Sequence, residues 1–107
     1  ERSAGISQRQ IARGWLACAY AAAGDRSRAA AIVEDFERQA KVEYVSPFAI
    51  GVAHTGLGQR EEAFAWLQRA AAAYDPYLAI NHREPLLDPL RSDPRFATLL
   101  RRLGIPP

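Results

Sequence analysis

Two stretches of this sequence carry the same pattern 34 residues apart. Gly24 corresponds to Gly58, and Ala29 corresponds to Ala63. The same register pairs Leu16 with Ile50, Ala17 with Gly51, Ala19 with Ala53, Tyr20 with His54 and Val33 with Leu67. Each stretch contains two apolar patterns with helical spacing, so the repeat predicts stacked helix–turn–helix units. Because such units bury their apolar faces against each other, we expect a single all-α domain over residues 1–107.

The first unit is expected over about residues 7–40. Ser7 is a candidate helix cap, and Gln10 follows three residues later, as in a capping box. Gly24 should end this helix, because glycine tolerates the left-handed conformation found at helix C-termini. Asp25 follows at once and should cap the second helix. A connection this short predicts an antiparallel helical hairpin.

The second unit, over about residues 45–75, repeats these signals. Ser46 precedes a proline, and serine before proline is a strong start signal for a helix. Gly58 should end that helix, as Gly24 does in the first unit. The small residues Gly51 and Ala63 are expected where the two helices of the hairpin come closest.

A third unit, over about residues 76–104, is degenerate. Pro85 and Pro89 fall inside its first helix, so a short helix and a bend are expected there. Asp93, followed by a proline, should cap a last helix that ends at Gly104. We expect this last helix to close the exposed apolar end of the stack as a capping helix.

Residues in this register match the tetratricopeptide repeat family. They are Leu16, Ala17, Tyr20, Gly24 and Ala29 in the first unit, and Ile50, Gly51, Gly58 and Ala63 in the second. Over about residues 10–76 the chain therefore resembles this family, whose members form a right-handed α–α superhelix and bind other proteins without catalysis. The chain departs from the family where His54 replaces a tyrosine, and where Arg13 and Pro47 replace a tryptophan.

The C-terminal segment carries a narrower resemblance. Three motifs carry it: DPLRSDPRF over residues 88–96, LLRRL over residues 99–103 and YVSPF over residues 44–48. Together they resemble the C-terminal repeat region of multidomain bacterial signalling and regulatory proteins. The resemblance implies that this domain serves a larger bacterial protein, and it does not identify the domain that precedes the repeats there.

One apolar stripe is the candidate partner groove. In the family this stripe lines the concave surface that holds a peptide or a helix. The corresponding residues here are Ile11, Gly14, Cys18 and Ala21 in the first unit, and Val45, Phe48, Val52 and Thr55 in the second. Their apolar character favours an amphipathic helix or a neighbouring subunit as the partner. The alternative is that the chain's own neighbouring segments cover the stripe.

The sequence contains no pattern typical of catalysis or of a cofactor site. There is no phosphate-binding glycine loop and no nucleophile elbow, so no enzyme activity and no cofactor are expected. The single cysteine, Cys18, is interpreted as a small buried hydrophobe, and His54 as a packed histidine. His82 is expected in a solvated loop. Acidic pairs on the helices, Glu34 with Glu37 and Glu61 with Glu62, are interpreted as solvated helix faces rather than metal or catalytic sites.

Two alternatives to partner binding in a groove remain: nucleic-acid binding and homo-oligomerisation. The formal net charge is +2, which does not demand a polyanionic partner. Arg91, Arg95, Arg101 and Arg102 cluster near the C-terminus and permit nucleic-acid binding, although they also complement helix C-termini and nearby aspartates. The second alternative is homo-oligomerisation, through the stripe or an uncovered N-terminal face. A lone cysteine and the lack of a long apolar run favour a cytoplasmic protein with no membrane partner.

Overall fold

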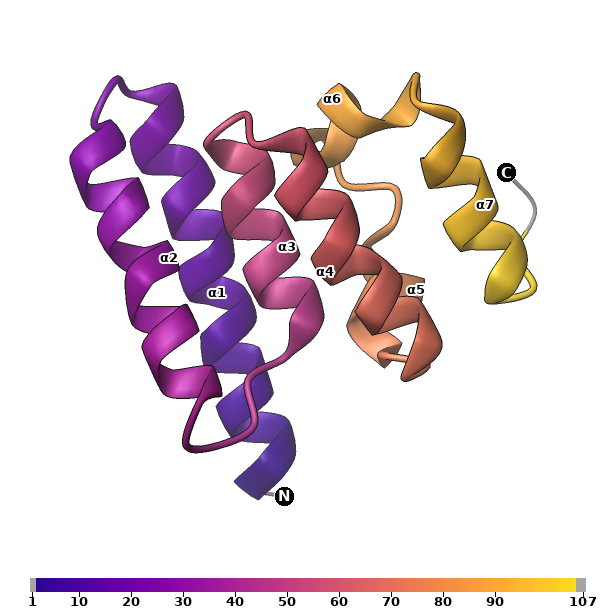
Figure 1. The fold of residues 1–107 in the computed structure, drawn as a ribbon, viewed down its shortest axis with the longest axis horizontal. Coiled ribbons are helices and arrows are strands. Elements are labelled where there is room, and N and C mark those ends of the chain that lie inside the picture. Colours follow the sequence, from indigo (N-terminus) through magenta and orange to yellow (C-terminus); the bar gives the residue numbers. More distant parts are fainter. Residues whose placement is uncertain (1, 106–107) are drawn as a thin grey trace.

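The computed structural model describes residues 2–105, with side chains from residue 9 onward. This part of the chain contains helices and no β-strand, which confirms the expected all-α fold. The elements are α1 (Arg2–Ala22), α2 (Arg26–Ala40), α3 (Pro47–Gly56), α4 (Arg60–Ala72), α5 (Pro76–Asn81), the 3₁₀ helix η1 (Pro85–Leu87), α6 (Asp88–Arg91) and α7 (Pro94–Arg102). Figure 1 shows α2, α1, α3 and α4 side by side, with α5 to α7 following at one end.

Glycines make the turns inside both hairpins, as the sequence predicts. Gly24 has a φ of +88° and Gly58 has a φ of +75°, a region that side chains with a Cβ rarely adopt. After the first turn, the Asp25 carboxylate accepts a hydrogen bond from the backbone N–H of Arg28 at 3.2 Å. Asp25 is therefore the expected cap of α2.

The caps of α3 and α5 are joined to each other. Ser46 Oγ accepts from the backbone N–H of Ala49 at 3.4 Å and donates to Asp75 Oδ2 at 2.9 Å. The other Asp75 oxygen accepts from the backbone N–H of Tyr77 at 2.9 Å, which caps α5. Both capping residues are buried, so each satisfies polar groups that water cannot reach.

The first helix starts earlier than the sequence predicts. It begins at Arg2, and Ser7 lies within it, so the expected cap at Ser7 is wrong. Gln10 does not turn back to complete a capping box. It is buried, its Oε1 accepts from the backbone N–H of Ser46 at 2.8 Å, and its Nε2 donates to the Tyr44 carbonyl at 3.2 Å. The polar groups of the loop between α2 and α3 compete successfully for this side chain.

Small residues let neighbouring helices approach closely. A Cβ on Gly51 would lie 3.4 Å from the Ala63 carbonyl, which confirms that these residues face each other between α3 and α4. Between the two hairpins, α1 packs along α3. A Cβ on Gly56 would lie 2.7 Å from Cys18 Cα, so this crossing requires glycine.

The third unit is interrupted as its prolines predict. The short helices α5, η1 and α6 replace one continuous helix, and prolines begin all three or stand within their first turn. Asp93 then caps α7, accepting from the backbone N–H of Arg95 at 2.9 Å. Helix α7 packs against α4, and its apolar residues Phe96, Leu99 and Leu100 are buried.

Candidate binding surfaces

The stripe predicted as a partner groove lies in the interior of this structure. Ala21 is half-buried, and the other seven members are buried. The buried members are Ile11, Gly14, Cys18, Val45, Phe48, Val52 and Thr55. The reason is that α1 packs along α3, while η1 contacts α3 as well. Cys18 Sγ donates to the Val52 carbonyl at 3.3 Å, and the Trp15 ring meets Phe48 edge-on at 5.9 Å. The chain's own segments therefore cover the stripe, and it is not an open groove here.

A different face of α1 is open. Four residues at helical spacing are exposed there: Ala12, Leu16, Ala19 and Ala23. Their counterparts 34 positions later are all buried: Ser46, Ile50, Ala53 and Leu57. The contrast is sharpest at the apolar pair, because Leu16 is 43% exposed and Ile50 is 0% exposed.

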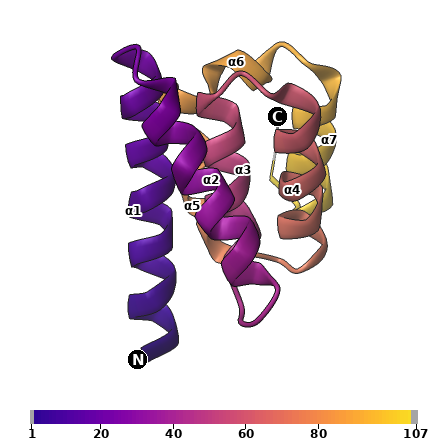
Figure 2. The ribbon, with the colours of Figure 1, turned by 60° about the vertical axis from the view of Figure 1, so that its left-hand side comes forward.

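The cover over the second unit explains this contrast. Helix α2 packs on α3, and Arg26 Nη2 donates to the Leu57 carbonyl at 2.6 Å. No helix among residues 2–105 occupies the corresponding place beside α1, which forms one edge of the ribbon in Figure 2. Leu16 and Ile50 share a position in the 34-residue register, but only Ile50 is buried. We call Ala12, Leu16, Ala19 and Ala23 the α1 face.

An acidic pocket lies where α2 meets the second hairpin. Its volume is about 300 Å³, and it is lined by Ala30, Val33, Glu34, Glu37, His54, Leu57, Gln59 and Glu62. His54 is buried, which confirms the prediction of a packed histidine. Sequence reasoning assigned Glu34 and Glu37 to one solvated helix face and Glu62, with Glu61, to another. The period of 34 residues, which stacks α2 beside the start of the second hairpin, is the signal that could have brought them together.

Most arginines of the predicted basic cluster are engaged in local contacts. Arg91 pairs with Asp88 at 2.6 Å and donates to the carbonyls of His82 and Glu84. Arg101 lies on the exposed surface of α7 with its Nη2 3.4 Å from Thr98 Oγ1. Arg102 is exposed in the last turn of the same helix. Both thus lie at the negative end of the helix dipole, as expected.

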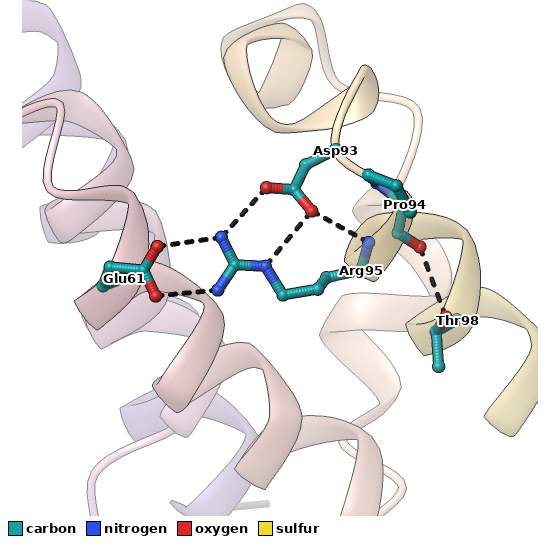
Figure 3. A network of polar contacts seen from close by, with 5 residues as sticks. All are labelled: Glu61, Asp93, Pro94, Arg95 and Thr98. Atoms are coloured by element: carbon teal, nitrogen blue, oxygen red, sulfur yellow. Dashed lines mark hydrogen bonds and ion pairs between the residues drawn. The ribbon is translucent and has the colours of Figure 1, made fainter.

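Arg95 joins α7 to α4, as Figure 3 shows. Its guanidinium makes two hydrogen bonds to Glu61, at 2.8 and 3.0 Å, and also bonds both oxygens of Asp93. It lies over the Phe64 ring, 4.3 Å from the centroid. These hydrogen bonds hold the pKa of Asp93 at about 2 and lower the pKa of Glu61, while the pKa of Arg95 is raised. Arg95 is therefore a structural contact between units.

The remaining candidate residues show no reactive arrangement. Burial raises the pKa of the Cys18 thiol to about 11, so the nucleophilic thiolate is disfavoured at neutral pH. His82 is half-buried at the end of α5, where its Nδ1 lies 2.8 Å from the Ala79 carbonyl. Within residues 2–105, no cluster of three or more histidine, cysteine or carboxylate side chains has the arrangement of a metal site.

No helix of residues 2–105 combines the length and the apolar character that crossing a bilayer requires. No protein-family model, curated protein or solved structure matches the chain.

Proposed function

We propose that this chain is a non-catalytic protein–protein interaction module of the tetratricopeptide type. In this proposal its hairpins form the start of a right-handed superhelix, and the module serves a larger cytoplasmic signalling or regulatory protein of a bacterium. The 34-residue register, the glycine turns and the packing of α1 along α3 support the repeat assignment. The stripe buried between α1 and α3 is not the docking surface, because the chain already covers it.

The observation that carries the proposal is the open α1 face. The second unit shows what such a face accepts, because α2 packs on α3, where Ile50 and Ala53, the equivalents of Leu16 and Ala19, are buried. The fitting partner is thus a helix that resembles α2, with small and branched apolar residues facing Leu16. An arginine in its first turn would reach the carbonyl at the end of α1, as Arg26 reaches Leu57. Covering the exposed part of Leu16 would contribute about 1 kcal/mol.

A peptide with the sequence of residues 26–40, blocked at both ends and labelled for fluorescence anisotropy, is a direct probe of this face. We expect saturable binding to the full chain that Leu16→Asp abolishes. Leu86→Asp is the matched control, because Leu86 is 42% exposed and lies on η1 rather than on α1. Equal binding to both variants, or no saturable binding to the wild-type chain up to about 1 mM, would refute the docking face.

Sedimentation of the unlabelled chain tests the homo-oligomer alternative. A concentration-dependent dimer that Leu16→Asp disrupts would mean that a second copy occupies the α1 face. A monomer at every concentration leaves the face to a different protein.

A further inference from the structure

The acidic pocket is lined mainly by hydrogen-bond acceptors, with the Gln59 amide as a further polar group. Three glutamate carboxylates and the imidazole of His54 lie around a pocket whose other walls include Ala30, Val33 and Leu57. The pocket is formed by α2 on one side and by the turn of the second hairpin on the other. Its volume of about 300 Å³ is at the lower end of the range found for small-ligand sites.

The imidazole of His54 supplies a buried acceptor. His54 is only 4% exposed, and its Nδ1 lies 2.7 Å from Gln59 Oε1. An amide oxygen only accepts hydrogen bonds, so Nδ1 carries the proton and Nε2 of the neutral ring is left with its lone pair. This Nε2 is buried and has no hydrogen-bond partner among the described side chains. Such unsatisfied buried atoms are rare, because losing water without a replacement is costly.

Glu37 does not satisfy this nitrogen while the ring is neutral. Glu37 Oε2 lies 3.6 Å from Nε2, and both atoms are acceptors, so no hydrogen bond joins them. The Glu37 side chain is 51% exposed and is free to rotate toward a ligand. A group that donates two hydrogen bonds, one to each atom, would satisfy both acceptors at once.

The pocket also holds negative charge that the chain does not neutralise. Elsewhere the carboxylates of Asp25, Asp35, Glu61, Asp88 and Asp93 each pair with an arginine. No arginine or lysine among the described side chains pairs with Glu34, Glu37 or Glu62. The pocket therefore combines uncompensated negative charge with an unsatisfied buried acceptor.

We propose that the acidic pocket between α2, α3 and α4 binds a guanidinium group. A guanidinium carries positive charge, five N–H donors and no acceptor, which complements a site whose polar groups are mainly acceptors. It is more weakly hydrated than an ammonium, so its transfer to a half-buried pocket costs less. Nε2 is enclosed beside Glu37, so the exposed Glu37 side chain must turn aside to admit the ligand. The guanidinium plane can then present one N–H to His54 Nε2 and a second to Glu37, while Glu34 and Glu62 add charge from α2 and α4.

Other ligand classes fit these residues less well. Anions are repelled by three carboxylates, and the described residues contain no cluster that would hold a metal ion. The apolar wall formed by Ala30, Val33 and Leu57 suits the methylene stem that an arginine side chain carries. The guanidinium can belong to an arginine of a protein or to a free small molecule, and the experiment below separates these sources.

The test is an NMR titration of the full chain with N-acetyl-L-arginine amide, followed through the imidazole of His54 and the amides of α2. We expect saturable shifts with a dissociation constant on the order of 1 mM, as for a small ligand held by a few polar contacts. N-acetyl-L-citrulline amide has nearly the same shape without the charge and should not bind. The lysine analogue should bind at least about fivefold more weakly.

A further arm identifies the source of the guanidinium. Free L-arginine binding as tightly as the blocked form indicates a small molecule, whereas weaker binding, through repulsion of its carboxylate, indicates an arginine within a chain.

Variants make the assignment specific to the pocket. Glu37→Gln should reduce the affinity for N-acetyl-L-arginine amide at least about tenfold, and His54→Phe should do the same while helical circular dichroism persists. Glu84→Gln is the matched control, because it removes the same charge from an exposed site outside the pocket and should leave affinity unchanged. The proposal is overturned if citrulline amide binds equally, if Glu84→Gln and Glu37→Gln behave alike, or if the pocket resonances do not respond to the arginine probe.

Discussion

Leu16 and Ile50 occupy equivalent positions in the 34-residue sequence register but differ in burial, and this difference predicts unequal costs of truncation. Replacing either residue by alanine removes about three methylene equivalents, or about 2.4 kcal/mol of transfer free energy if the site is fully buried. Ile50 is 0% exposed, so a cavity term adds to this loss and the total should be about 3 to 4 kcal/mol. Leu16 is 43% exposed, so about 1.4 kcal/mol remains, with no cavity term because the site opens to solvent.

Urea unfolding followed by circular dichroism measures both values. With identical slopes, the midpoint of Ile50→Ala should fall at least about twice as far as that of Leu16→Ala. The measurement should be made at low protein concentration, where association through the α1 face does not contribute. Equal losses in the two variants would refute the reasoning, because they would show that Leu16 is as completely packed as Ile50.

Three more outcomes follow from the contacts between units. Gly56→Ala should destabilise the fold by about 1 kcal/mol, because the clash with Cys18 Cα exceeds the gain in helix propensity, and unchanged or higher stability in urea would contradict the close crossing. Folding lowers the pKa of Asp93 to about 2, so the ionised carboxylate stabilises the folded state at pH values above the pKa of about 3.9 that it has in the unfolded chain. This contribution is lost as the pH falls toward about 2. Urea titrations at several pH values should show a smaller loss over that interval in Arg95→Met than in the wild type. Cys18 should react with a thiol reagent at least about 100-fold more slowly in the folded chain than in urea at pH near 8, and comparable rates would show that the thiol is accessible.

Local signals in the sequence predicted the hairpins well. The turns at Gly24 and Gly58 and the caps at Asp25, Ser46 and Asp93 lie where the sequence places them. These features depend on residues within one helical turn, so a single stretch of sequence suffices to predict them. Ser7 shows the limit of such signals. Helix α1 begins before it, and Gln10 accepts a hydrogen bond from the backbone N–H of Ser46 instead of completing a capping box.

Surface assignments depended on contacts that no single stretch contains. The residues predicted to line a groove are buried because α1 and α3 approach closely enough to cover them. The register alone could not show that Leu16 would lack the cover that Ile50 has. The pocket at His54 was likewise missed, because Glu37 and Glu62 lie on different helices and meet only when the second hairpin stacks on the first.

The spacing of the cross-unit hydrogen bonds also bears on how the chain folds. Three of these hydrogen bonds join residues that are 34 positions apart: Gln10 with Tyr44, Cys18 with Val52, and Glu61 with Arg95. Contacts with such modest sequence separation close short loops, so folding should be fast and should require no pairing of distant chain ends. Each unit is stabilised mainly by its neighbours, so unfolding should begin at an end of the stack and proceed inward. Helix α3, which contacts α1, α2 and α4, should therefore retain its amide protons longest in hydrogen exchange.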